Sequence, residues 1–130
     1  MTIEQDIIRY LAGYPEIKLA VLFGSLSRGR AQAHSDLDFA VAMAHPLASA
    51  EKMKLIEGLA LAVGRPVDLI DLQSVDGLVL TQVLTTGKIL RCTDHTLYAE
   101  LIKKMLFNDA DMMPYRRRIL AERRKTWIGI

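Results

Sequence analysis

Two short stretches of the chain carry residues whose types and spacing could do chemistry together. Gly24-Ser25 follows an apolar run, and after ten further residues Asp36-Leu37-Asp38 opens the next apolar run. Side chains two apart on a strand share a face, roughly 7 Å apart, so Asp36 and Asp38 would present paired carboxylates that favour a cation between them. A strand that ends in glycine and turns into a short helix aims backbone N–H groups at an anion, commonly a phosphate. The two stretches together indicate a site for a cation and a phosphate group.

Two predicted strands must position these stretches. Residues 18–23 and 37–43 are apolar runs of strand length on either side of the polar loop. The unbroken apolar run after Asp38 indicates a strand covered on both faces, and a carboxylate that enters a buried strand needs a partner. On spacing alone, Asp-x-Asp is also compatible with a solvated turn before a half-exposed strand, and Gly-Ser with an ordinary tight turn.

A phosphate-binding P-loop is the nearest competing interpretation, because Gly24-x4-Gly29 follows a strand as that motif does. Arg30 stands where the motif requires lysine, and Ala31 where it requires serine or threonine. Both the amine that reaches the phosphates and the hydroxyl that binds magnesium are therefore missing, and the motif is excluded.

A third apolar run, residues 66–72, contains two more carboxylates, Asp68 and Asp71. Because they are an odd number of residues apart, they face opposite sides of a strand, and only one of them can join Asp36 and Asp38. The register of the strand decides which one, and the pattern of residues alone leaves both open.

The order of Gly24-Ser25, ten residues and Asp36-Leu37-Asp38 resembles the signature of the polymerase-beta-like nucleotidyltransferase superfamily, in particular its MNT-type (MntA-like) minimal members. The resemblance covers about residues 1–93. It implies that Gly24 and Ser25 hold the phosphates of the nucleotide and that Asp36 and Asp38 hold two magnesium ions.

The same resemblance assigns the third carboxylate to Asp68, which would complete the metal site and accept a proton from the attacking hydroxyl. Asp71 is then a cap or a loop contact. Arg28, or else Arg30, would balance charge on the departing pyrophosphate, with a solvated loop position as the alternative for each.

The remaining pattern predicts an α/β (α+β) fold, a small mixed β-sheet with helices packed on one side of it. A capping box begins at Thr2, a short strand is expected at 88–92, and Asp94 caps a helix that runs to about Phe107. Further helices are expected at 47–63 and 74–86. The chain is predicted to be a single domain, 1–130, with a core at about 1–93 and a C-terminal helical segment at about 94–130.

Composition sets limits on the class of protein. The chain is 51% hydrophobic and 25% charged with a formal net charge of +2, a balance that argues against direct nucleic-acid binding. No export signal or apolar run of membrane-spanning length is found, so a cytoplasmic location is expected. Cys92 is predicted to be a small core residue, and His34 and His45 to be ordinary loop residues.

The C-terminal segment is the one asymmetric part of the sequence. Residues 108–130 hold six Lys or Arg against three acids. The segment is a solvated helix face, a surface for an acidic protein partner or a surface for an RNA backbone. Five apolar side chains favour the protein partner over RNA: Met112, Met113, Trp127, Ile128 and Ile130. An RNA surface would need a denser basic stripe with several stacking aromatic side chains.

The function implied by the resemblance is a magnesium-dependent nucleotidyltransferase antitoxin. It would transfer AMP from ATP to a tyrosine of a partner HEPN-domain ribonuclease toxin and so neutralise it. A non-catalytic antitoxin that only binds the toxin, and a small-molecule nucleotidyltransferase of the aminoglycoside type, are the alternatives. The sequence leaves the nucleotide, the modified residue and the stoichiometry open.

Overall fold

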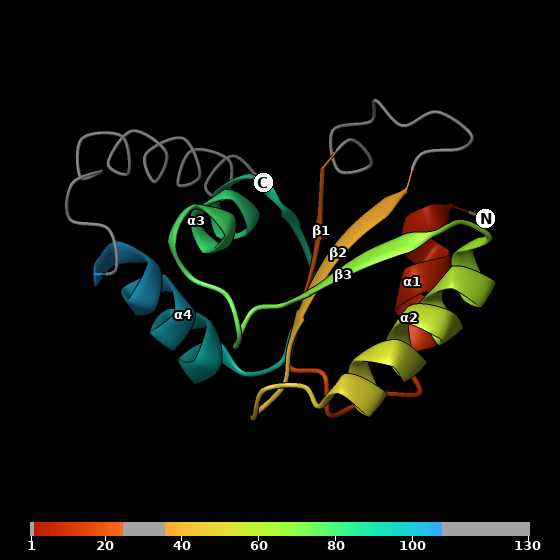
Figure 1. Ribbon diagram of the computed structural model, residues 1–130, viewed down its shortest axis with the longest axis horizontal. Coiled ribbons are helices and arrows are strands. Elements are labelled where there is room, and N and C mark those ends of the chain that lie inside the picture. The colour runs from red at the N-terminus through yellow and green to blue at the C-terminus, as the bar shows by residue number, and fades with distance from the viewer. Residues whose placement is uncertain (1, 25–35, 108–130) are drawn as a thin grey trace.

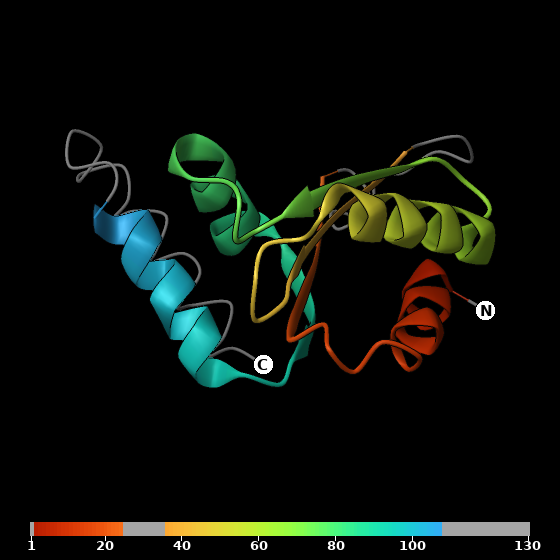
Figure 2. The same ribbon diagram turned by 60° about the horizontal axis from the view of Figure 1, so that its bottom comes forward.

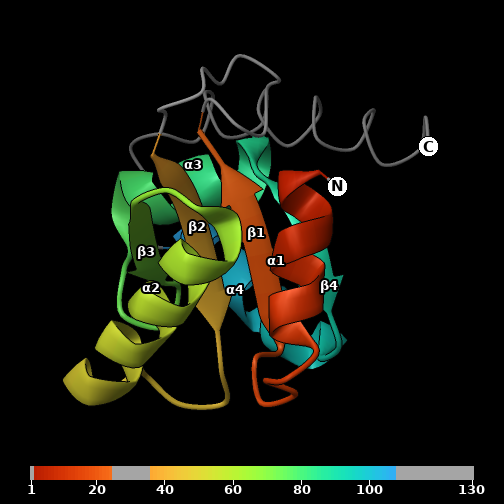
Figure 3. The ribbon, with the colours of Figure 1, turned by 90° about the vertical axis from the view of Figure 1, so that its right-hand side faces the viewer.

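The centre of the fold is a mixed sheet of four strands in the order β3-β2-β1-β4. The computed structural model describes residues 2–24 and 36–107. β1 is antiparallel to both β2 and β4, whereas β3 is parallel to β2 (Figure 3). The strands are β1 (Leu19–Phe23), β2 (Leu37–Ala42), β3 (Val67–Asp71) and β4 (Lys88–Cys92). The predicted mixed sheet is thus confirmed.

Helices cover both faces of the sheet (Figures 1, 2 and 3). α1 (Ile3–Leu11) and α2 (Ser49–Val63) pack on one face, and α3 (Gly77–Thr86) and α4 (His95–Phe107) on the other. The prediction that the helices lie on one side was wrong. The physical reason lies in β2, where Phe39 packs into the cluster under α1 and α2 while Ala40 and Ala42 pack into the cluster under α3 and α4. A strand apolar on both faces requires two covering layers.

Local signals in the sequence set the ends of the helices well. The backbone N–H of Gln5 donates to Oγ1 of Thr2 at 3.1 Å, and the Gln5 side chain accepts from the Thr2 N–H, so the predicted capping box is present. The N–H of Leu97 donates to Oδ1 of Asp94 at 3.0 Å, which confirms the predicted cap of α4. α3 begins at Gly77 rather than at Ser74, because Ser74 is held in a turn by its N–H bond to the Asp71 carbonyl at 3.0 Å.

Arg91 on β4 joins the sheet to the end of α1. Its Nη1 donates to the carbonyl of Tyr14 at 2.8 Å, and its Nη2 donates to the carbonyl of Leu11 at 2.6 Å. Each of these carbonyls also accepts a backbone N–H in the turns after α1, from Tyr14 at 2.9 Å and from Ile17 at 3.1 Å, so the guanidinium adds a charged donor to carbonyls that are already bonded. The connection between α1 and β1 is therefore held against β4.

The structure also describes two of the residues expected to have no chemical role, Cys92 and His45. Cys92 is half-buried against the cluster under α3 and α4. His45 is exposed, and its Nδ1 bonds to the carbonyl of the neighbouring Pro46. Across 2–24 and 36–107, no helix is long and apolar enough to span a membrane. His34 and the C-terminal residues 108–130 lie outside the described residues.

Candidate active site

Three carboxylates come together where β2 and β3 begin. Asp38 lies directly opposite Asp68 in the parallel register of the two strands, whose backbones are about 4.8 Å apart. Asp36 precedes β2 by one residue and lies two residues before Asp38. Because Leu37 and Leu69 pack under α1 and α2, alternation directs Asp38 and Asp68 to the opposite face of the sheet. The structure thus brings all three predicted carboxylates together.

The electrostatics of this cluster disfavour three ionised groups. The pKa of Asp38 is raised, first by burial and then by the negative charges of Asp68 and Asp36. Asp38 is half-buried, whereas Asp36 and Asp68 are exposed. A bound cation would stabilise the ionised form of a half-buried carboxylate that has other carboxylates beside it.

Gly24 forms the turn that lies against this cluster. It follows Phe23, which is paired with Asp38 across β1 and β2, and its φ of 76° is in the left-handed region. A Cβ atom added to Gly24 would collide with Oδ2 of Asp38 and come within 3.0 Å of its Cγ. Glycine is required here for conformation and for space. Ser25, Arg28 and Arg30, the other residues predicted around the phosphates, lie outside the described residues.

Asp71, the alternative third carboxylate, lies on the other face of β3 and binds loop residues there. Its side chain is only 5% exposed and accepts three hydrogen bonds. The donors are the N–H of Leu47 at 2.8 Å, the N–H of Gln73 at 2.9 Å and Oγ of Ser74 at 2.8 Å. The structure therefore places Asp68 with Asp38 and uses Asp71 as the predicted loop contact.

The carboxylates are not arranged as a finished metal site. Within 2–24 and 36–107, no group of three His, Cys, Asp or Glu side chains is close enough to hold a metal ion as it stands. Exposed side chains such as those of Asp36 and Asp68 change rotamer readily, so the spacing of their backbones is the relevant observation. That spacing, with oxygen ligands only, suits a hard cation such as Mg²⁺.

A cavity lined by described residues reaches one of the carboxylates, Asp68. A groove of about 420 Å³ runs beside β3 and is lined by Asp68, Ile70 and Asp71, with Ser49 and Lys52 of α2 on one wall and Ser74 and Val75 on the other. The sequence contains no signal for these wall residues, since Ser49 and Lys52 read as the solvent face of a helix.

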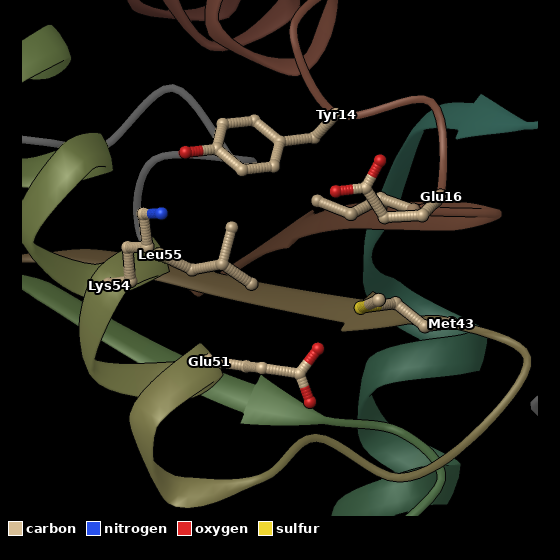
Figure 4. A pocket seen from close by; sticks show the side chains of 7 residues that line it. Tyr14, Glu16, Met43, Glu51, Lys54 and Leu55 are labelled. Carbon is tan, nitrogen blue, oxygen red and sulfur yellow. The ribbon is translucent and has the colours of Figure 1, made fainter.

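The second cavity contains none of the predicted site residues. It measures about 180 Å³ and lies where α2 faces the chain before β1, between the Tyr14 ring and Met43 (Figure 4). Glu16 and Glu51 are its carboxylates, and Glu51 already accepts the N–H of Ala48 at 3.0 Å. It therefore lacks the paired carboxylates that the chemistry requires.

The sequence is similar to that of a known enzyme family. The chain matches the family described as Polymerase beta, Nucleotidyltransferase over residues 5–96. Protein adenylyltransferase MntA of Shewanella oneidensis is 39% identical over 99 residues, which are 74% of this chain and 71% of that protein.

Two solved structures are similar along nearly their whole length. One is described as a toxin-antitoxin with AMP-PNP and has a TM-score of 0.72 at 32% identity, covering 92% of this chain and 96% of that chain. Another is a tri-AMPylated Shewanella oneidensis HEPN toxin in complex with MNT antitoxin, with a TM-score of 0.65 at 32% identity over 91% of this chain and 96% of that chain. Sequence and fold thus agree on one set of relatives.

Proposed function

Since the chain belongs to the Polymerase beta nucleotidyltransferase family, we propose that it is a protein adenylyltransferase antitoxin. It transfers AMP from ATP to a tyrosine of a partner HEPN-domain ribonuclease toxin and thereby neutralises the toxin. The observation that carries this function is the cluster of Asp36, Asp38 and Asp68 on one face of the sheet beside the Gly24 turn. The relatives support it, because one is named an adenylyltransferase and another is complexed with an AMPylated toxin.

The carboxylates are assigned to two magnesium ions. Asp36 and Asp38 would hold both ions, and Asp68 would complete the second site. Bound magnesium neutralises charge on the triphosphate and lowers the pKa of the attacking hydroxyl. The raised pKa of Asp38 supports this assignment, because burial first and the negative charges of Asp68 and Asp36 second disfavour its ionised form, and a bound cation would compensate that charge.

The residues of the chain then position the transfer. Backbone N–H groups after Gly24, with Ser25, hold the outer phosphates, and Arg28 or Arg30 balances charge on the leaving pyrophosphate. The phenolic oxygen of the acceptor bonds to the α-phosphorus as the bond to pyrophosphate breaks. Asp68, exposed beside Asp38, accepts the phenolic proton. Such a reaction needs positioning and charge compensation more than covalent chemistry by the protein.

Two other functions compete with this one. An antitoxin that acts by contact alone has no use for three carboxylates gathered on one face. A small-molecule nucleotidyltransferase requires an enclosed pocket for its acceptor, whereas the groove at Asp68 is open along the sheet edge. We assign the protein to the cytoplasm, where its ATP is available.

The C-terminal segment is assigned to the partner. Residues 108–130 combine basic and apolar side chains, and every residue assigned to the metal site lies before residue 93. A chain ending after Phe107 should therefore lose toxin binding more than nucleotide binding. Equal losses in a pull-down and a nucleotide titration would instead make the segment part of the folded core.

The decisive experiment incubates the protein with ATP, magnesium and the purified toxin, followed by intact-mass spectrometry. The toxin should gain the mass of one or more AMP groups on tyrosine, and the Asp38→Asn variant should add none. An inhibited but unmodified toxin would establish the contact-only function. Modification of an added aminoglycoside in place of the toxin would establish the drug-modifying one.

A further inference from the structure

The outer edge of β3 is open in the part of the chain that the structure describes. β3 is the last strand of the sheet on its side, so only β2 pairs with it (Figure 3). The carbonyl of Pro66 accepts from Leu37 at 2.8 Å and the N–H of Leu72 donates to Val41 at 2.8 Å, which fixes which residues face β2. Backbone groups alternate along a strand, so those of Val67 and Leu69 point away from β2. Neither residue has a backbone partner within 2–24 and 36–107.

The groove beside this edge follows β3, since residues 68–71 line it. Its floor is the outer edge of β3, and its walls are the first turns of α2 and the loop that leads to α3. The walls offer hydroxyls and an ammonium group, from Ser49, Lys52 and Ser74, where a polypeptide needs polar neighbours. Unpaired N–H and C=O groups at a sheet edge bind another strand by regular backbone hydrogen bonds.

The groove also begins at the proposed chemistry, because Asp68 lines it and is paired with Asp38. We propose that the segment of the toxin that carries the acceptor tyrosine binds as an added strand along the outer edge of β3. This inference rests on the proposed function and names how its acceptor docks. A strand added there lies about 4.8 Å from Asp68 and roughly twice that from Asp38.

Tyrosine specificity follows from this distance. On the added strand, alternate side chains point to the face that carries Asp38 and Asp68. A tyrosine among them extends its hydroxyl past Asp68 toward Asp38, whereas the hydroxyl of serine or threonine stays beside its own backbone. Replacing the acceptor tyrosine by serine should therefore abolish transfer without releasing the toxin.

The first test measures amide hydrogen exchange by NMR in the free protein and in its complex with the toxin. The N–H of Val67, a half-buried residue, should exchange freely in the free protein and slow at least tenfold in the complex. Leu69 is only 3% exposed, so its N–H should exchange more slowly in the free protein and slow further in the complex. Cys92 on the opposite edge is the control: Thr93 donates to Lys18 at 2.9 Å, so the backbone groups of Cys92 point away from β1. Its exchange should not change.

The second test removes one edge donor without touching the ladder between β2 and β3. Val67→Pro deletes an N–H that points away from β2, at a strand position where proline is tolerated. Transfer of AMP to the toxin should fall about tenfold, the loss expected for one backbone hydrogen bond. Val67→Ala keeps the N–H and removes the same side chain, so it should transfer AMP at nearly the wild-type rate. Nucleotide binding should be unchanged in both variants.

Three results would overturn the inference. The amide of Val67 could exchange equally fast in the complex and in the free protein, or it could already be protected in the free protein. In the latter case, the molecular mass in solution would show whether a second copy or the chain itself covers the edge. Equal transfer by the proline and alanine variants would exclude backbone pairing. If the wild type leaves the toxin unmodified, the proposed function fails instead, which is a separate outcome.

Discussion

Replacing Gly24 by alanine tests whether the turn after β1 positions Asp38. Two effects are expected, because Gly24 has a φ of 76° and a Cβ there would collide with Oδ2 of Asp38. The left-handed conformation costs an alanine about 1–2 kcal/mol. The collision is expected to push the carboxylate aside, and a displacement of about 1 Å at a reacting centre lowers turnover by about 10²-fold.

Gly64, at the end of α2, is the matched control. Its φ of 71° is almost the same as that of Gly24, but a Cβ added there meets no atom within 4 Å. Gly64→Ala should therefore lose a similar 1–2 kcal/mol of unfolding free energy, about the strain of the conformation, and keep full transferase activity. The pair separates backbone strain from damage to the site.

The assay combines urea unfolding of each variant with the initial rate of AMP transfer to the toxin at saturating ATP. Comparable losses of unfolding free energy, with a loss of rate only in Gly24→Ala, are the expected result. A folded Gly24→Ala variant that transfers AMP within threefold of wild type would refute the reasoning, because the turn would then not hold Asp38 in place.

Three further predictions concern the carboxylates and the connection from β4 to α1. Asn in place of Asp36, Asp38 or Asp68 should lower AMP transfer by more than about 10²-fold without unfolding the protein; Asp71→Asn should keep the chemistry but lower the unfolding free energy by about 1–3 kcal/mol, because a buried acceptor of three hydrogen bonds is weakened. Because the folded-state pKa of Asp38 is raised, wild-type protein in a chelator should lose stability as the pH rises from the pKa of the unfolded state through that of the folded state. The Asp38→Asn variant should not show this loss, and magnesium should restore the stability of the wild type. Melting temperatures measured across this pH range check both results. Arg91→Met should lower the unfolding free energy by about 2–4 kcal/mol, measured by denaturant titration, since carbonyls of Leu11 and Tyr14 lose a charged donor.

Hydrophobic pattern predicted the parts of this fold that depend on local spacing. Apolar runs marked all four strands, and the caps at Thr2 and Asp94 marked the starts of two helices. The odd separation of Asp68 and Asp71 predicted that they face opposite sides, and the structure confirms it. These features need only the geometry of a strand or a helix end.

Features that depend on distant parts of the chain were missed. The unbroken apolar run after Asp38 indicated a strand covered on both faces, but nothing local in Ala40 or Ala42 shows that α3 and α4 supply the second layer, so the helices were predicted on one side. Ser74 looks like a helix start until Asp71 is seen to hold it in a turn. The wall of the groove is made by Ser49 and Lys52 only because α2 returns beside β3.

The opposed positions of Asp68 and Asp71 also limit how this strand can change in evolution. Insertion or deletion of one residue between them would turn both acids to the same side, bury one without its donors and expose a core leucine. A change of two residues would preserve the facing of each acid, as would substitutions that keep the strand length. Related proteins should therefore differ in β3 by substitutions and by length changes of two residues. The length of β3 should vary less among them than the identity of its apolar residues.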